Sequence, residues 1–167
     1  MNKLQNSANI TYRRSTVEDM TVVFSLVSAS VRLLSPVPYS QDVVDTWMHG
    51  RDVEDYRSDC ADSRIWIAEI EGRAIGFSHG ETGEIKRLFV DADFAGFGVG
   101  AALMKRALDD ALSCGSGEVL IEATLNAVPF YKKWGFHEVG EGVFPGRKGL
   151  PPIHVIQLNA KFGGKND

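Results

Sequence analysis

The stretch RLFVDADFAGFGVGAALM, residues 87–104, decides the fold of this chain. Apolar residues up to Val90 are typical of the end of a β-strand, and the residues after position 98 have the pattern of a helix. Between them lie three alternating glycines, Gly96, Gly98 and Gly100. Glycines leave backbone N–H groups uncovered, and a helix N-terminus carries partial positive charge. The segment therefore predicts a strand, a loop and a helix that together bind a phosphate or pyrophosphate.

Two known phosphate-binding motifs compete as explanations of this loop. A P-loop is excluded, because the chain has no Gly-Lys-Ser/Thr triplet. A dinucleotide-binding turn stays open, since Gly96-x-Gly98-x-x-Ala101 fits its pattern and Glu122 follows about 20 residues later. The residues DADFA separate this turn from its strand and a hairpin precedes it, which is unusual for that motif. This alternative would make the protein a Rossmann-type NAD(P)-dependent oxidoreductase.

The periodicity on either side of the loop predicts a mixed order of strands and helices. Ile65, Ile67 and Ile70 alternate with polar residues, as in the first strand of a hairpin. Thr16 with Asp19 resembles a capping box, and Ser40 is a candidate N-cap. The expected strands cover 10–15, 64–71, 74–81, 83–90, 118–124, 136–144 and 153–162, and the expected helices cover 17–33, 41–50, 99–115 and 128–134, with a short helix and loop in the charged segment 51–63.

These elements predict an α/β (α+β) fold with a mixed central sheet of about six to seven strands and about four flanking helices. The 167 residues suit a single domain spanning 1–167, with a short flexible N-terminus and a frayed tail at 163–167. The stretch EVLIEAT, 118–124, is apolar enough for a buried parallel strand.

Composition narrows the class of protein further. A net charge of −4 argues against a nucleic-acid partner, and no apolar run is long enough for a membrane span. The N-terminus lacks the apolar region of a secretory signal. Two cysteines, Cys60 and Cys114, have no metal-ligand spacing, so we expect reduced thiols, no metal site and a cytoplasmic location.

Two segments together resemble the GCN5-related N-acetyltransferase (GNAT) family. Residues 87–104 are similar to its acyl-CoA signature, Arg/Gln-x-x-Gly-x-Gly/Ala, with Gly98 and Gly100 on the two glycines. Ala95 stands where the family prefers Arg or Gln, so one side chain is lost while the backbone donors stay. The segment TLNAVPFYKKWGF, 124–136, looks like the family's later Asn and Phe-Tyr-x-x-x-Gly-Phe motif.

The resemblance implies transfer of an acyl group, usually acetyl, from acetyl-CoA to a primary amine of a small molecule or peptide by direct attack in a ternary complex. It implies that Tyr131 is the acid that protonates the CoA sulfur, and that Asn126 binds the cofactor arm. The backbone of Leu88, Phe89 and Val90 should pair with the pantetheine, with the Val90 N–H near the thioester carbonyl. The backbone amides expected around the pyrophosphate are those of Phe97, Gly98, Val99, Gly100 and Ala101.

Four side chains are candidates for the base that deprotonates the amine. An alkyl amine has a pKa of about 10 and must lose a proton before it attacks. Glu84 is the first candidate, because it starts the strand that ends at the loop, at a position that carries a catalytic glutamate in some family members. His79, Glu81 and Glu122 are rivals, and His79 has the best unperturbed pKa for a base.

In the family, the first two helices and the late strands build the acceptor site, here roughly 30–50 and 140–152. Arg32 is a candidate for an acceptor carboxylate, and Tyr39 and Trp47 lie in the same region. The resemblance allows a homodimer through the final strands. It also allows a non-catalytic acyl-CoA sensor on the same fold, because Ala95 departs from the pattern.

Overall fold

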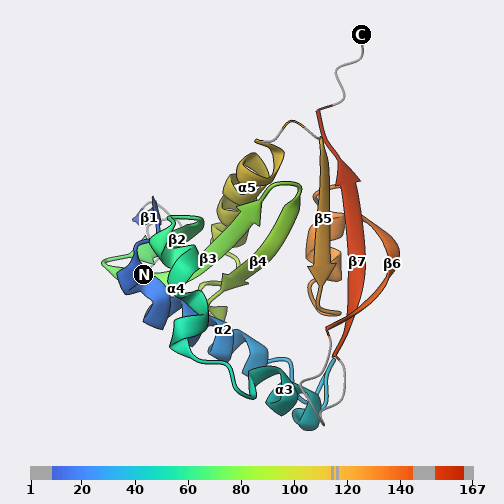
Figure 1. Ribbon diagram of the computed structural model, residues 1–167, viewed down its shortest axis with the longest axis horizontal. Helices are drawn as coiled ribbons and strands as arrows, with labels where there is room; N and C mark the ends of the chain where they lie inside the picture. Colours follow the sequence, from blue (N-terminus) through green and yellow to red (C-terminus); the bar gives the residue numbers. More distant parts are fainter. Residues whose placement is uncertain (1–8, 114, 116, 145–152, 164–167) are drawn as a thin grey trace.

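The computed structural model describes residues 9–113, 115, 117–144 and 153–163 (Figure 1). One sheet contains the strands β1 (Ile10–Arg14), β2 (Ile65–Ile70), β3 (Arg73–Glu81), β4 (Glu84–Val90), β5 (Glu118–Ala123), β6 (His137–Phe144) and β7 (Ile153–Lys161). The helices are α2 (Met20–Arg32), α3 (Gln41–Met48), α4 (Arg57–Ala61), α5 (Val99–Leu112) and α6 (Val128–Lys132). Three short 3₁₀ turns, Val17–Asp19, Val53–Tyr56 and Ala92–Phe94, accompany them.

The α/β class and the seven-stranded sheet confirm the expectation from the sequence. The described residues form five α-helices where about four were expected, because the charged segment 51–63 folds into a 3₁₀ turn followed by α4. The predicted flexible N-terminus lies largely in 1–8, outside the described residues, as do residues 145–152 and most of the predicted frayed tail, 164–167.

Local capping explains where the first helices begin. The Thr16 N–H donates to the Asp19 carboxylate at 2.7 Å, which completes the predicted capping box. The Ser40 hydroxyl accepts a hydrogen bond from the Val43 N–H at 3.3 Å, at the start of α3.

The sheet is antiparallel except between β4 and β5. Its order is β1-β2-β3-β4-β5-β7-β6, and the parallel pairing covers only Glu84 with Leu120 and Ile85 with Ile121. Past Ile85 the two strands diverge, as Figure 1 shows between the green and orange halves of the sheet. A single parallel pair does not fit the mostly parallel sheet of a dinucleotide-binding domain. The Rossmann alternative is therefore wrong.

A bulge in β4 marks the point of divergence. His79 of β3 pairs with Arg87, but Gly80 pairs with Ile85, which leaves Lys86 as an extra residue in β4. A bulge bends its strand and increases the local twist. Lys86 thus lies where β4 leaves β5 and the split begins.

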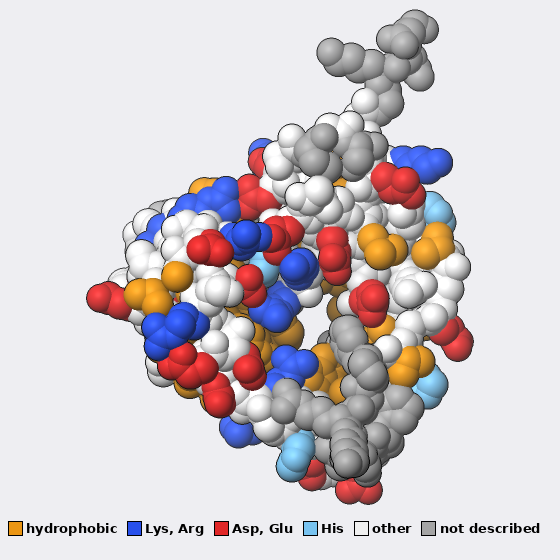
Figure 2. Space-filling view, viewed as in Figure 1, with side chains coloured by type: hydrophobic (Ala, Val, Ile, Leu, Met, Phe, Trp, Pro, Cys, Tyr) orange, Lys and Arg blue, Asp and Glu red, His pale blue; other side chains and the backbone are white. Residues whose placement is uncertain are grey.

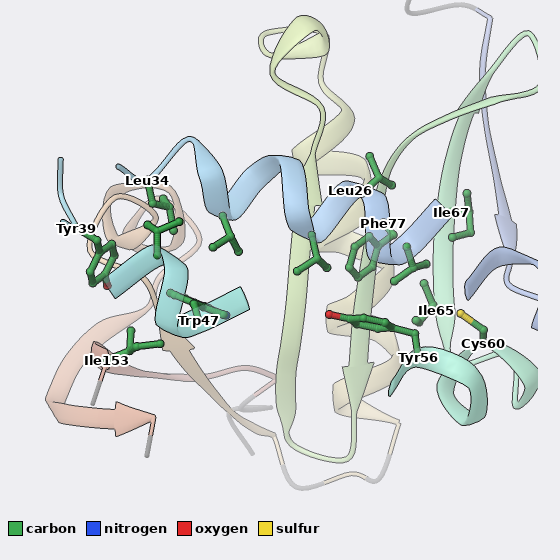
Figure 3. Close-up of a cluster of buried hydrophobic side chains, with 14 residues drawn as sticks. Leu26, Leu34, Tyr39, Trp47, Tyr56, Cys60, Ile65, Ile67, Phe77 and Ile153 are labelled. Carbon is green, nitrogen blue, oxygen red and sulfur yellow. The ribbon is translucent and has the colours of Figure 1, made fainter. Parts of the chain in front are cut away.

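Helices cover both faces of the sheet. Phe77 of β3 packs in the cluster with α2 and α3, whereas the next residue, Ser78, donates from its hydroxyl to the Leu103 carbonyl of α5 at 2.9 Å. Figure 3 shows the first cluster, in which side chains of α2, α3 and the segment around Tyr56 meet those of β2 and β3. On the other face α5 lies very close, since a Cβ on Gly80 would collide with the Ala107 carbonyl oxygen.

Candidate active site at the split between β4 and β5

The first part of the site is a groove of about 560 Å³ at the start of α5. Gly96 and Gly98 adopt φ values of 82° and 80°, in the left-handed region that favours glycine. The first α5 bond runs from the Ala102 N–H to the Gly98 carbonyl at 3.1 Å, so three earlier N–H groups have no partner within the helix. The groove is lined by Leu88, Val90, Phe94, Ala95, Gly96, Gly98, Val99, Gly100, Ala101, Asn126, Ala127, Phe130, Tyr131 and Lys133.

Most residues predicted to bind acyl-CoA lie on this groove, with two exceptions. Phe89 lines a neighbouring cavity and stacks on Phe77, with 5.4 Å between ring centroids. Phe97 lines neither space, and its backbone N–H donates to the Phe94 carbonyl at 3.4 Å in the turn before α5. Asn126 lines the groove, and its side-chain oxygen accepts from the Thr124 hydroxyl at 2.6 Å, so it does not cap α6.

The backbone of β4 faces the split with two N–H groups. The Asp91 N–H donates to Ile75 on the β3 side at 2.8 Å. Backbone groups alternate in direction along a regular strand, and the register from Arg87 to Val90 is regular. The N–H groups of Leu88 and Val90 therefore point away from β3, toward the split, where β5 no longer pairs with β4. An extended ligand could therefore accept hydrogen bonds from these two N–H groups, as a neighbouring β-strand would.

The second part of the site is a cavity of about 280 Å³ on the other side of the split. Figure 2 shows a deep hollow in this part of the molecule, with Lys and Arg side chains gathered along the side formed by β4. Leu88, Ala127 and Tyr131 line both the cavity and the groove, so the two spaces share one wall. The cavity is lined by Val27, Trp47, Arg51, Glu84, Lys86, Arg87, Leu88, Phe89, Glu122, Ala123, Thr124, Ala127 and Tyr131.

Tyr131 stands in the shared wall and is held by aromatic neighbours. Its ring makes edge contacts with Phe130 and Phe136, at centroid distances of 5.3 and 6.1 Å. Burial raises the pKa of its hydroxyl well above the usual value, so the group is protonated at neutral pH. The hydroxyl has no hydrogen-bond partner among the described residues, which leaves its proton available to a ligand.

The structure separates the four candidate bases into two groups. Glu84 and Glu122 both line the cavity, from β4 and β5. His79 and Glu81 line neither space. The His79 ring is fully buried, its Nε2 lies 2.9 Å from Glu81, and burial lowers its pKa to about 4. A side chain with no access to either space is poorly placed to take a proton from an amine.

Asp59, His79 and Glu81 are close enough together to suggest a metal site. Cations already surround them, since Arg87 lies 3.4 Å from Asp59 and Lys86 lies 2.9 Å from Glu81. Glu81 also forms an ion pair with Arg64. The protein itself thus neutralises these carboxylates, and the group forms a partly exposed ion-pair network around the buried His79.

Sequence reasoning missed the cations of the cavity. Arg51, Lys86 and Arg87 line it, whereas Arg32 lines a separate hollow with Gln41 and His49. Arg51 lies outside the two motif segments, and Arg87 is the first residue of the stretch 87–104 but not one of its signature positions, so the common direction of the two side chains results from tertiary packing.

The two aromatic candidates near the acceptor region have different positions. Trp47 lines the cavity, but Tyr39 is buried behind it, with its hydroxyl bonded to the backbone at His154 and Leu125. The part of the predicted acceptor region at 145–152 lies outside the described residues.

Comparison with known proteins identifies the architecture around this split. A family model described as "Acetyltransferase (GNAT) domain" matches residues 37–149, more than half of the chain. The chain belongs to the GNAT acetyltransferase family. It is 26% identical over 131 residues to the uncharacterized N-acetyltransferase YafP of Escherichia coli strain K12, which covers 78% of this chain and 83% of that protein.

Solved GNAT structures share the fold over most of the chain. A GCN5-related N-acetyltransferase from Rhodopseudomonas palustris superposes with a TM-score of 0.82 at 21% identity, covering 91% of this chain and 95% of that one. The PaiA N-acetyltransferase from Thermoplasma acidophilum, solved in complex with coenzyme A, gives 0.67 at 18% identity, covering 92% and 99%. At these identities the likeness concerns the fold. Among the described residues, no helix of this GNAT protein is long and apolar enough to cross a membrane.

Proposed function

We propose that this protein transfers an acetyl group from acetyl-CoA to a primary amine of a small molecule or peptide, by direct attack in a ternary complex. One observation carries the proposal: the groove and the cavity share the wall formed by Leu88, Ala127 and Tyr131. A donor and an acceptor bound on the two sides would meet at this wall. Membership of the GNAT family supports the choice of reaction.

The groove has the donors that acetyl-CoA requires. The N–H groups of Val99, Gly100 and Ala101 at the start of α5 would bind the pyrophosphate, since Ala95 offers no side chain for it. The N–H groups of Leu88 and Val90 would hold the pantetheine arm like an added strand. Bound acetyl-CoA supplies the activated thioester. The Val90 N–H is the donor we assign to the developing oxyanion.

Two side chains handle the protons. Glu84 takes a proton from the acceptor ammonium, directly or through water, so that the nitrogen lone pair forms the new N–C bond. The nitrogen of the adduct would then give up its second proton to water, the C–S bond would break as its electron pair moves to sulfur, and Tyr131 would donate its proton there and regain one from solvent. The raised pKa of Tyr131 keeps that proton in place until negative charge develops nearby. Glu122 is the alternative base, because it lines the same cavity.

The acid role is tested with Tyr131→Phe, which keeps the ring and its contacts with Phe130 and Phe136. We expect the turnover number to fall by about 10²–10⁴-fold, the usual contribution of a positioned proton donor. Affinity for acetyl-CoA, measured by titration calorimetry, should change little. Unchanged turnover would remove Tyr131 from the acid role.

The base role is tested by comparing Glu84→Gln with Glu122→Gln, which are matched changes in one cavity. Loss of the base should remove the acidic limb of the pH–rate profile in the Glu84 variant and preserve it in the Glu122 variant. The reverse result would transfer the role to Glu122. The activity of both variants is measured by the release of free CoA thiol with a panel of amines. If the wild-type protein binds acetyl-CoA but releases no thiol with any amine, the result would favour an acyl-CoA sensor instead.

A further inference from the structure

The acceptor cavity contains charges of both signs that are not paired with each other. Arg51, Lys86 and Arg87 line it together with Glu84 and Glu122. Within the described residues, neither carboxylate lies within 4.0 Å of a cation. Figure 2 shows the Lys and Arg side chains beside the hollow, on a protein whose net charge is −4. The positive charge is therefore local to the cavity and not a property of the whole surface.

The two arginines are held in place by groups behind the cavity wall. The buried ring of Tyr56 lies under Arg87, 5.0 Å from the guanidinium carbon to the ring centroid, and its hydroxyl lies 3.4 Å from Arg51 Nη1. Figure 3 shows this hydroxyl directed away from Cys60, toward the side of Trp47. Arg51 Nε donates to the Trp47 carbonyl at 2.8 Å. The guanidinium groups of Arg51 and Arg87 are thus oriented before a ligand binds.

The charge of Arg51 has no counterion inside the part of the chain that the structure describes. Lys86 and Arg87 have carboxylate partners in Glu81 and Asp59, and neither of those lines the cavity. Arg51 makes only contacts to a carbonyl and a hydroxyl, which are neutral. The guanidinium of Arg51 is half-buried and faces a cavity with two further cations. Like charge destabilises it there, and a bound anion would stabilise it.

We propose that the acceptor amine also carries an anionic group, a carboxylate or a phosphate, and that Arg51 and Arg87, with Lys86, bind it. The inference rests on the proposed function, since it describes the acceptor of that reaction. The cations would bind the anion, and Glu84 or Glu122 would face the ammonium of the same molecule. A zwitterionic acceptor thus matches the separated charges of the cavity, whereas a simple alkyl amine would leave Arg51 without an anionic partner.

The cations are badly placed to serve acetyl-CoA instead. The pyrophosphate donors and Lys133 line the groove, and none of the three cations of the cavity does so. Their side chains lie with Val27 of α2 and Trp47 of α3, on the acceptor side of Tyr131. An effect of Arg51 on the affinity for acetyl-CoA would contradict this assignment.

The first experiment uses the wild-type protein saturated with CoA and measures binding by titration calorimetry. Probe pairs differ only in the anion: glycine with glycinamide, phenylalanine with phenylalanine amide, and phosphoethanolamine with ethanolamine. We expect at least one charged member to bind at least tenfold more tightly than its neutral partner. The amino acids report a carboxylate and phosphoethanolamine reports a phosphate. Equal binding within every pair, or no binding by any charged member, would overturn the inference.

The second experiment assigns the effect to residues. Arg51→Gln should reduce the affinity of the preferred charged probe about tenfold or more and leave the neutral partner unaffected. Arg87→Gln should have the same effect, and it keeps the test possible if Arg51→Gln fails to fold. Arg32→Gln removes the same charge from the separate hollow and is the matched control. Equal losses in Arg32→Gln, or no loss in either cavity variant, would contradict the proposal.

The two proposals fail in different ways. Binding of charged probes without thiol release would leave the anion site in place and would contradict acetyl transfer to these amines. Acetylation of neutral amines as fast as charged ones, with Arg51→Gln unchanged, would preserve the transferase and remove the anion site.

Discussion

His79 of β3 is a completely buried histidine whose ring lies beside the carboxylate of Glu81. Its Nε2 contacts Glu81 at 2.9 Å, whereas its Nδ1 is buried without a hydrogen bond, 3.9 Å from Asp59. Burial lowers the pKa of His79 to about 4, with Arg87, Lys86 and Arg64 acting in the same direction and Asp59 opposing them. The ring is therefore neutral in the folded protein at neutral pH.

The residue-scale prediction concerns stability against acid. The unfolded chain takes up the His79 proton near pH 6.5, whereas the folded chain resists protonation until about pH 4. The unfolded state thus binds more protons in this window, so stability falls as the pH falls from 6.5 to 4, by up to about 1.4 kcal/mol per pH unit for one proton. Urea unfolding between pH 7 and 4.5 measures this slope. His79→Gln should flatten it, and an equal slope in the variant would place the effect elsewhere.

At the scale of elements, the decisive unit is the turn that leads from β4 into α5. Gly98 caps the helix with φ at 80°, and a Cβ there would meet nothing within 4 Å. The glycine is therefore required by backbone conformation and not by protein packing. The same conformation directs the first N–H groups of α5 at the groove.

Gly98→Ala should weaken both the fold and the binding of acetyl-CoA. Forcing alanine into a left-handed conformation costs about 1 kcal/mol or more of folding stability. Gly72→Ala is the matched control, because Gly72 has φ at 78° in the β2–β3 turn and also meets nothing within 4 Å. Thermal unfolding should show similar losses in the two variants. Only Gly98→Ala should reduce the affinity for acetyl-CoA severalfold, and equal affinities would argue against a ligand at this turn.

At the scale of the molecule, the sheet is two halves that meet at two residue pairs of β4 and β5. Tyr39 lies just before α3 and connects this helix to the half of the sheet that contains β5 and β7. Its hydroxyl donates to the His154 carbonyl of β7 at 2.7 Å and accepts from the Leu125 N–H after β5 at 3.1 Å. Its ring meets Trp47 edge-on at 6.1 Å, and Trp47 lines the acceptor cavity.

Tyr39→Phe should therefore loosen the acceptor side of the split. The change removes two partly buried hydrogen bonds, to the His154 carbonyl and from the Leu125 N–H, which costs about 0.5–1.5 kcal/mol of stability for each bond. We expect a higher KM for the amine than in the wild type and a smaller change for acetyl-CoA. Tyr12→Phe is the control, since the Tyr12 hydroxyl makes no hydrogen bond to another described residue. A similar loss of stability in both variants would deny Tyr39 this linking role.

The sequence by itself determined the elements, the glycine turn before α5 and the family motifs at 87–104 and 124–136. These depend on local periodicity, capping and backbone freedom, which short stretches of chain encode. Only the tertiary structure decided which charges meet. The extra residue Lys86 bends β4 away from β5, and packing directs Arg51 into the cavity while Arg32 lines another hollow. Side-chain direction depends on strand register and on contacts between residues far apart in the chain, so local pattern carries no signal for it.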